Sequence, residues 1–450
     1  HRFWNPGTLP GVRHFIYQKL RSNTLSVLIL CVALMVAGAA NAQVSTSVTM
    51  SGSPIAGSPF ASLAAAVTAI NGLTITGPVV ATAAAGSETN PSGGYSITAT
   101  GTSTNTITIQ GAGAASTIIT APNPAGTAGN LNDAIFKIIG GDYITISGFS
   151  MNENAANTTT TAASNNMVEW GVALLYASTT NGAQNCTIQN NTIDLNRTYQ
   201  NTFGIYSNST HSATAPSTSA SATTAAGGNK GIKIYSNTIT DVNNGIVIVG
   251  PTAAADANTG IEVGGTSLGN TLTNFGTTGT FSTYANVSGT VNGILIRNSN
   301  GFVISNNSIT SSAGGTTAGT LNGIQVPAAS ATPTTTFTNN INNNTIALQS
   351  GNAAGGINGI NYPSGSASTT SILNCNSNNF TQLNHSLAAT GSIIGITIAS
   401  TNLTTSIGNN TFTNLTTNTT GSFTFISASY STPASGTKTI NNNSIVTAFN

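Results

Sequence analysis

Charged side chains are the scarcest feature of this chain. Only 10 Lys and Arg and 9 Asp and Glu occur among 450 residues, or 4%, where an average globular protein has about 25%. The net charge of +1 comes with no basic run, so the chain lacks the electrostatic footprint that nucleic acid or an anionic membrane requires. We therefore expect no nucleic-acid partner, and no membrane partner once the export signal described below is removed.

Acidic residues are absent from the whole C-terminal part of the chain. The last carboxylate is Glu262, so the final 188 residues (450 − 262) contain none. Glycoside hydrolysis needs two carboxylates facing one cleft. Lyases that use a hard cation need several oxygen ligands together. These requirements exclude most of the chain as a catalytic surface, and we expect neither a metal ion nor another cofactor.

Catalysis remains conceivable only in the early part of the chain. If the protein is an enzyme, the residues able to converge are Asp142, Glu169, Asp194 and Arg197. The structural interpretation is that Asp142 is a turn residue and that Glu169 flanks a buried Trp170. Asp194 and Asp241 follow their apolar neighbours by one and two residues, and strand alternation would place them on opposite faces unless a bulge intervenes. We favour the structural interpretation of these acids.

Cysteine is almost as rare as charge. Of the three cysteines, Cys31 lies in the export signal, which leaves Cys186 and Cys375. They belong to sequence repeats five copies apart, or roughly 24 Å at the spacing of stacked strands. Because a disulfide needs Cα atoms within about 7 Å, we expect two unpaired, buried cysteines.

A short phrase of the form Asn-Asn-Thr/Ser-Ile returns along the chain. Its apolar residues lie 46, 33, 37, 37, 34, 32 and 33 residues apart. Such a period predicts a solenoid, in which each repeat buries its apolar face on its neighbours. The copies are Asn190–Ile193, Ser236–Ile239, Gly269–Leu272, Asn306–Ile309, Asn343–Ile346, Asn378–Phe380, Asn409–Phe412 and Asn442–Ile445.

One repeat shows the expected unit of three short strands. The strands are expected at 302–305, 308–310 and 322–326, with Asn306-Asn307 as a sharp corner. Asn tolerates the left-handed backbone of such a corner, and its amide can bond to the equivalent Asn one coil away. We expect glycine to supply the same freedom before Ile at Gly245, Gly293, Gly323, Gly359 and Gly395. This pattern predicts an all-β parallel β-helix of about 11 coils over residues 73–450.

Aliphatic and aromatic residues at fixed places in the repeat should form the core. Burying each such side chain is worth about 1.5–3 kcal/mol, so stacked apolar residues must hold the coils together. The expected inward residues are Ile188, Ile193, Ile234, Ile239, Ile294, Ile309, Ile324, Ile346, Ile360, Phe380, Ile396 and Phe412.

The N-terminal region divides into three segments. Residues 1–18 form an unassigned leader, and residues 19–42 have the basic, apolar and small-residue regions of a signal peptide. Residues 43–72 are expected to cap the stack with a short helix whose apolar stripe is Phe60, Leu63, Val67 and Ile70. We interpret the end at Asn450, inside a repeat, as a C-terminal truncation.

Three phrases carry a resemblance to a known family: Gly140–Phe149, Met167–Gly171 and Gly182–Ile193. They resemble large secreted bacterial β-strand-repeat proteins, which are similar to pectate-lyase-like right-handed β-helices. Members of that family often end in a sorting domain for delivery to the cell surface. The resemblance, which spans roughly residues 55–310, implies a right-handed helix and a surface location. It implies no particular reaction.

Hydroxyl side chains flank the apolar residue of many copies of the repeat. Both flanks of an inward strand residue point outward, so these side chains should form two columns on one face. Similar Thr ranks occur in ice-binding β-solenoids, although Asp194, Ala347, Asn379 and Val446 interrupt the pattern. The candidate outward binding face is Thr238, Thr240, Thr271, Thr273, Ser308, Thr310, Thr411 and Thr413.

These observations favour a non-catalytic function. We expect an exported repeat module of a bacterial cell-surface protein, a stalk or adhesin, with a carbohydrate or other surface ligand as its partner. The alternatives are a polysaccharide lyase or hydrolase with its site in the N-terminal coils, and an ice-binding solenoid. The oligomeric state does not follow from the sequence.

The core assignment makes a first prediction. The Ile309→Asp substitution should destabilise the coils on both sides of residue 309, because an unpaired charge would replace a buried side chain. A circular-dichroism melt should show a lower transition temperature than that of the wild type. An unchanged melt would exclude residue 309 from the core.

Overall fold

The computed structural model describes residues 48–52, 57–125, 133–160, 167–215, 220–276, 290–313, 319–327, 335–363 and 368–450. They belong to one compact unit, Ser45–Asn450. The unassigned leader and the signal peptide lie outside the described residues. The boundaries proposed at residues 43, 73 and 450 stay predictions.

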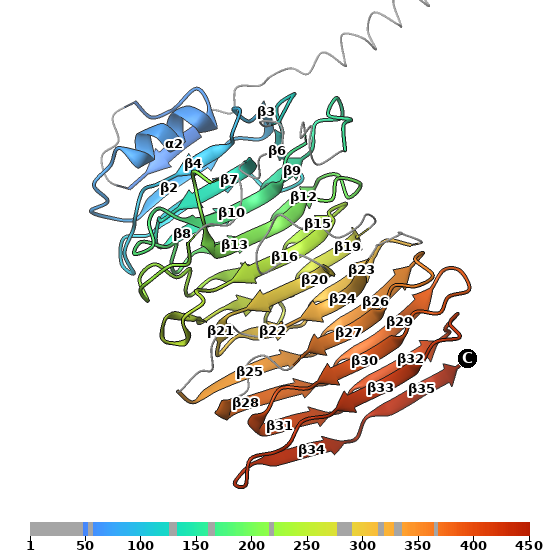
Figure 1. Cartoon of the computed structure of the whole chain (residues 1–450). Helices are drawn as coiled ribbons and strands as arrows, with labels where there is room; N and C mark the ends of the chain where they lie inside the picture. Colours follow the sequence, from blue (N-terminus) through green and yellow to red (C-terminus); the bar gives the residue numbers. More distant parts are fainter. Residues whose placement is uncertain are drawn as a thin grey trace, which may run out of the picture. The chain divides into compact units, whose positions relative to one another are not determined.

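Three long sheets run along the unit, and each coil contributes one strand to each of them in turn (Figure 1). We call them sheets A, B and C. Sheet A has 12 strands: β1 (Val48–Ser51), β2 (Val79–Ala83), β5 (Ile107–Gly111), β8 (Ile144–Ser147), β11 (Thr187–Gln189), β14 (Lys233–Tyr235), β18 (Glu262–Val263), β22 (Val303–Ser305), β25 (Phe337–Asn342), β28 (Ser368–Asn376), β31 (Asn402–Gly408) and β34 (Thr437–Asn441).

Sheet B follows sheet A within each coil, and from β11 and β12 onward the two strands are joined across the Asn corner. Its 11 strands are β3 (Gly86–Thr89), β6 (Thr117–Thr120), β9 (Ser150–Asn152), β12 (Thr192–Asp194), β15 (Thr238–Thr240), β19 (Thr271–Phe275), β23 (Ser308–Ser311), β26 (Thr345–Ser350), β29 (Asn379–His385), β32 (Thr411–Leu415) and β35 (Ser444–Phe449).

Sheet C closes each coil. Its 10 strands are β4 (Tyr95–Ile97), β7 (Ala134–Ile139), β10 (Trp170–Tyr176), β13 (Phe203–Ser212), β16 (Asn244–Val249), β20 (Thr290–Arg297), β24 (Thr320–Gln325), β27 (Ile357–Tyr362), β30 (Ile393–Ile398) and β33 (Phe423–Ala428).

The strand pairing confirms a parallel β-helix. Every pair within the three sheets is parallel except β1 with β2, so 11 of the 12 strands of sheet A mark successive coils. This number agrees with the expected coil count. A parallel pair requires a crossover connection, which the other two sides of each coil provide.

A short helix covers the N-terminal end of the stack, as expected, although Phe60 of the predicted apolar stripe precedes the helix. Helix α2 spans Leu63–Asn71, and its N-cap Ser62 accepts a hydrogen bond from the Ala65 N–H. Leu63, Ala66, Val67 and Ile70 are its buried residues. At its C-terminal end, the Asn71 amide bonds to the backbone of Ser96, Thr98 and Ala99, beside strand β4 at the edge of sheet C. The helix therefore satisfies backbone groups that the first coil would otherwise leave unpaired.

All twelve residues predicted to point inward are buried, with at most 2% of the side chain exposed. They belong to one core cluster that runs from α2 to the last coils. Cys186 and Cys375 are also fully buried in this core and are free thiols, as expected. The prediction that stacked apolar residues hold the coils together is confirmed.

The two Asn residues of the repeated corner have different roles. The first has a left-handed backbone, with φ of 56° at Asn190 and 60° at Asn306. The second points inward and joins a ladder. The Asn307 Nδ2 donates to Asn344 Oδ1 at 3.0 Å and to the Val263 carbonyl at 2.9 Å, and its Oδ1 accepts from Asn270. The ladder runs through Asn191, Asn237, Asn270, Asn307, Asn344, Asn378, Asn410 and Asn443.

The prediction that the glycines of sheet C adopt left-handed backbone is wrong. Gly245, Gly293, Gly323, Gly359 and Gly395 are not among the residues with positive φ. A Cβ at Gly359 would instead lie 2.4 Å from the Phe380 ring, and one at Gly395 equally close to the Phe412 ring. These glycines make room for the inward side chains of sheet B. The rings of Phe380 and Phe412 consequently stack with centroids 4.8 Å apart.

The Asn ladder makes a prediction with a matched control. Asn307→Ala should lower the free energy of unfolding by about 2–4 kcal/mol, because it removes buried hydrogen bonds and leaves their partners unsatisfied. Asn306→Gly, one residue earlier, should change it by less than about 1 kcal/mol, since glycine adopts positive φ readily. Urea unfolding of both variants measures the difference. Equal losses would refute a structural role for the ladder.

Candidate functional site

One column of polar side chains runs along the outer face of sheet B. We call it the hydroxyl column. It combines Thr238, Thr271, Ser308 and Thr411 of the predicted face with equivalents in other coils. By strand register its members are Ser150, Thr192, Thr238, Thr271, Ser308, Thr345, Asn379, Thr411 and Ser444.

The second predicted column is less regular. Thr240 pairs with Thr273, as expected, and Asp194 precedes them in the same register. The pairing then shifts within β19, after Leu272, and again at the Ile346/Ala347 step. In addition, Thr310 pairs in straight register with Ala347, and Thr413 with Val446, so a residue without a hydroxyl interrupts the column at each of these places. The two columns together do not form a regular array.

The hydroxyl groups differ in their availability. Thr411 and Thr413 both donate to Asn379 Oδ1, at 2.9 and 2.8 Å, so the face partly bonds to itself there. Thr238, Thr271 and Thr345 are exposed, and their hydroxyls have no hydrogen-bond partner within the described part of the chain. The middle of the hydroxyl column is therefore the part that can bond to a ligand.

A hollow of about 560 Å³ lies at the N-terminal end of this face, between the loops that follow β9 and β12. Its volume falls within the range of about 300–1,000 Å³ that is usual for ligand pockets. Amide, hydroxyl and carboxylate groups dominate its lining. They come from Asn152, Glu153, Asn154, Asn157, Thr158, Thr160, Asp194, Asn196 and Thr198.

Two of the lining residues, Glu153 and Asp194, are acids with different surroundings. Burial raises the pKa of Glu153 to about 7. The Glu153 carboxylate nevertheless accepts hydrogen bonds from the Asn154 and Val168 N–H groups and the Asn157 amide. Burial, and to a lesser extent Asp241, also raise the pKa of Asp194. Asp194 is exposed and makes no side-chain hydrogen bond to any described residue, so its carboxylate is the free one.

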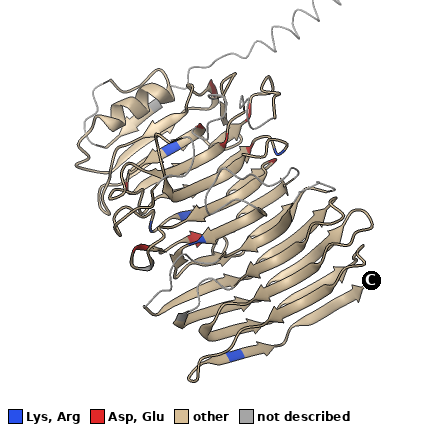
Figure 2. Ribbon diagram, in the orientation of Figure 1, with Lys and Arg blue, Asp and Glu red and all other residues tan. Residues whose placement is uncertain are grey.

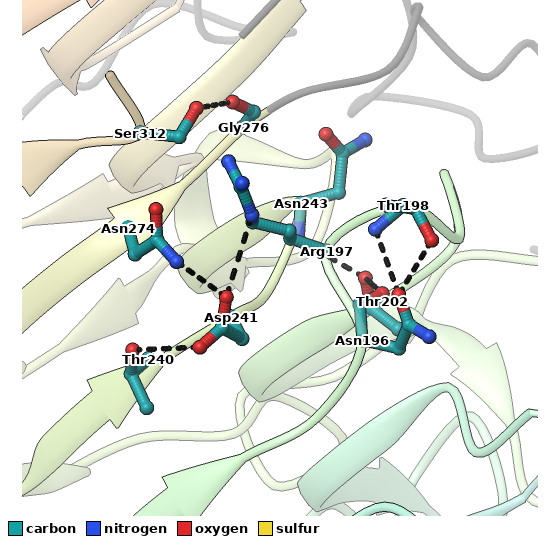
Figure 3. A network of polar contacts seen from close by, with 10 residues as sticks. All are labelled: Asn196, Arg197, Thr198, Thr202, Thr240, Asp241, Asn243, Asn274, Gly276 and Ser312. Atoms are coloured by element: carbon teal, nitrogen blue, oxygen red, sulfur yellow. Dashed lines mark hydrogen bonds and ion pairs between the residues drawn. The ribbon is translucent and has the colours of Figure 1, made fainter. Parts of the chain in front are cut away.

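Arg197, next to two of the lining residues, belongs to a polar network on the adjoining coil (Figure 3). Its Nε lies 3.4 Å from Asp241 Oδ1, and the same oxygen accepts from the Asn274 amide. The other oxygen of Asp241 accepts from Thr240 at 3.2 Å. Asp241 has a left-handed φ of 51°. This backbone turn, which alternation alone did not predict, allows Asp241 to interact with both Arg197 and Asp194.

The structure separates the four residues that the sequence suggested could converge. Asp142 lies at the corner between sheets C and A, where it accepts a 2.8 Å bond from the Gln184 N–H. Burial raises its pKa, and that bond opposes the shift. Glu169 immediately precedes β10 of sheet C. Asp194 is the last residue of β12 and Arg197 follows it three residues later, where Arg197 forms an ion pair with Asp241.

Glu169 is part of a buried cluster of ionisable side chains. Its backbone N–H donates to Asp133 Oδ1 at 2.9 Å, and its carboxylate accepts from the Asp133 N–H and from the Tyr199 hydroxyl. Burial raises the pKa of Asp133 and lowers that of Lys137, which lies near both acids. Glu169 is 0% exposed and is therefore not accessible to a ligand. Its hydrogen bonds with Asp133 hold neighbouring strands together.

Sequence reasoning missed several polar residues of this surface. Ser150, Thr192, Thr345 and Ser444 complete the hydroxyl column, and the repeated phrase itself could have identified three of them. Glu153 was missed because its loop matches no other copy of the repeat. No signal in the sequence indicated that loops 153–160 and 195–198 would enclose a hollow.

Charges are confined mainly to the N-terminal coils (Figure 2). After Arg297, the sequence contains a single charged residue, Lys438. Over the described ranges, no three His, Cys, Asp or Glu side chains come together in a way that could hold a metal ion. The part of the chain that the structure describes also contains no helix long and apolar enough to cross a membrane.

No family model and no curated protein matches the sequence. Among solved structures, the A-module of the Azotobacter vinelandii mannuronan C-5 epimerase AlgE4 is 12% identical, with a TM-score of 0.33 over 86% of this chain and 95% of that one. The AlgE6 A-module of the same organism is 14% identical, with a TM-score of 0.28 and the same coverage, 86% and 95%. A mannuronic acid specific polysaccharide family 6 lyase from human gut microbiota is 10% identical, with a TM-score of 0.30 over 80% and 81%.

The raised pKa of Glu153 predicts a pH-dependent stability. Its pKa is about 7 in the folded chain and near 4.5 when unfolded. The protonated form is therefore favoured by folding, so the contribution is complete below the unfolded pKa and is lost as the pH rises through about 7. With about 1.4 kcal/mol per pKa unit, the loss is up to roughly 3 kcal/mol.

Urea unfolding at pH 4.5 and 8 measures this effect when the wild type is compared with Glu153→Gln, which does not titrate at this position. The wild type should lose more stability between the two pH values than the variant does. Parallel pH profiles would show that Glu153 titrates normally.

Proposed function

We propose that this chain is a non-catalytic, exported β-helix module of a bacterial cell-surface protein that binds polysaccharide on the outer face of sheet B. The observation that carries the proposal is the continuous hydroxyl column, which ends beside the hollow around Asp194. Exposed hydroxyls and amides are groups that hydrogen-bond to sugar hydroxyls in both directions.

A rigid row of hydroxyls suits a long polymer. Successive members of the hydroxyl column are held at the strand spacing of about 4.7–4.9 Å. Because the strands fix the backbone, little conformational freedom is lost on binding. Each contact is weak, but a polysaccharide can occupy many coils at once, so that the total affinity grows by multivalency.

The acids support binding over catalysis. Glu88, Asp133, Glu153, Glu169, Asp241 and Glu262 each have hydrogen-bond partners within the fold. At the hollow, only the Asp194 carboxylate has no such bond to a described residue. Glycoside hydrolysis uses two carboxylates, one on each side of the scissile bond. A single available acid fits a role in orienting a ligand.

One observation favours the second candidate, cleavage of a polysaccharide. Glu153 and Asp194 line the same hollow, and a carboxyl group with a pKa near 7 has the protonation behaviour of a general acid. For that role, Glu153 would have to exchange its loop partners for a substrate. Ice binding has less support, because the register shifts at β19 and at Ile346/Ala347 break the Thr ranks.

Export and surface location rest on the sequence. The signal at residues 19–42 and the resemblance to secreted β-strand-repeat proteins support them, and the neutral outer faces suit a rod that spaces or presents other groups. A stalk or adhesin is the function that combines these features with the hydroxyl column.

Binding should depend on the middle of the hydroxyl column. The Thr238→Val/Thr271→Val double variant removes two exposed hydroxyls and keeps β-branched shape. Affinity electrophoresis in a panel of neutral and acidic polysaccharides should retard the wild type in at least one gel. The variant's affinity should fall about tenfold, since each lost hydrogen bond contributes about 0.5–1.5 kcal/mol.

The matched control is Thr145→Val/Thr187→Val, a neighbouring pair on the outer face of sheet A. It should bind like the wild type. The proposal would be contradicted if the two double variants were retarded equally. It would also be contradicted if no polysaccharide retarded the wild type. Release of product by the wild type but not by Asp194→Asn or Glu153→Gln would establish the second candidate instead.

A further inference from the structure

A second hollow, of about 270 Å³, lies on a different side of the helix from the hydroxyl column. It is at the corner between sheets C and A, beside the short strands β17 (Asn258–Thr259) and β21 (Ser299–Asn300). Residues from four successive coils form its lining, among them Lys230, Thr259, Asn300 and Phe337. No motif in the sequence indicated this site.

This hollow is open because two of the residues that line it are glycines, which have no side chain. Gly260 and Gly301 both line it and both have a left-handed φ of 67°. They occupy equivalent corners, each directly before a buried core residue, Ile261 or Phe302. The preceding corner has Gly231, also left-handed, at φ 64°. Because these corners carry no Cβ, the ledge between the coils is open to a small molecule.

Lys230 supplies the charge of the hollow. Its ammonium group takes part in no hydrogen bond or ion pair with the described residues. Burial lowers its pKa, and the nearby Asp256 only partly offsets this effect. A half-buried ammonium without a close partner gains from an anion that replaces its lost hydration. Because Lys230 is the only cation that lines the hollow and the nearby Asp256 repels additional negative charge, the hollow suits a ligand with no more than one negative charge.

The other walls suit a sugar ring. Phe337 is half-buried and lines the hollow, which gives it an aromatic surface. Asn300 and Thr259 line it as well, and their side chains make no hydrogen bond to any described residue. An apolar wall with a few well-placed polar groups is the usual composition of a small-molecule site.

We propose that this hollow binds a carboxylate-bearing sugar unit. Lys230 pairs with the carboxylate, the Phe337 ring packs against the apolar face of the sugar, and Asn300 and Thr259 bond to its hydroxyls. A phosphate ester fits less well, because it carries up to two charges and Lys230 is the only cation that lines the hollow. A neutral sugar would leave the ammonium unpaired. The site does not involve sheet B and is independent of the hydroxyl column.

Ligand titration of the full chain, followed by NMR of the ligand signals, tests this proposal. The probes are glucuronate and N-acetylneuraminate as acidic sugars from two sources, glucose as the neutral sugar, and acetate as the bare carboxylate. At least one acidic sugar should bind at least about tenfold more tightly than glucose and acetate, because charge-assisted hydrogen bonds act together with the ring contact. If acetate binds as tightly as the acidic sugar, the sugar assignment is wrong. If glucose binds as tightly as the acidic sugar, the role of Lys230 is wrong.

Two variants locate the site. Lys230→Gln should weaken binding of the acidic sugar at least about tenfold, and the matched variant Lys233→Gln should not. Lys233 lies three residues away, on the outer face of sheet A, and pairs with Glu262. Gly301→Asn should also abolish binding, because Asn tolerates the left-handed backbone and adds a side chain beside Phe337. A Cβ at Gly301 would lie 3.9 Å from the Phe337 Cβ, which is an ordinary contact, so the fold should persist.

Unchanged melting curves for all three variants confirm that the fold is intact. Binding that survives both Lys230→Gln and Gly301→Asn would overturn the proposal. The Thr238→Val/Thr271→Val variant should retain the acidic sugar. Failure of this site is thereby distinguishable from failure of the polysaccharide face on sheet B.

Discussion

The buried Asn ladder is the constraint on which the other features of this protein depend. Each ladder amide bonds to the same amide of the next coil and to a carbonyl of the preceding one, as at Asn307. A shift of one residue at a corner would leave these buried groups unpaired, at a cost of about 1–3 kcal/mol each. The ladder therefore holds these coils in register. Because the coils are in register, equivalent residues of successive repeats lie above one another in columns.

Register also explains why the chain contains so little charge. A charged residue at a repeated position would recur every 4.7–4.9 Å or so along the stack, and like charges that close repel one another. Hydroxyls and amides avoid this penalty because they donate and accept together, as Thr411, Thr413 and Asn379 do. Some of the charges that remain are paired with an opposite charge on a neighbouring coil, as Arg197 is with Asp241 and Lys233 with Glu262.

The sequence predicted what the repeat controls. The strands, the core residue Ile309, the corner at Asn306 and the helix before Asn71 all followed from local patterns. The purpose of Gly359 did not, because it depends on the Phe380 ring reaching across the core from another sheet. The surroundings of Asp194 could not be predicted either. They depend on loop lengths and on the left-handed turn at Asp241, which the repeat does not encode.

Both hollows occur where the chain departs from its repeat, one in the loops after β9 and β12 and the other beside β17 and β21. Regular coils present the same groups at every level, so they give avidity for a polymer with little selectivity. Irregular coils place unlike groups together, such as Lys230 with Phe337, and only unlike groups can distinguish one sugar from another. The two proposals together therefore assign polymer binding to the regular coils of sheet B and selectivity to the few places where the repeat is broken.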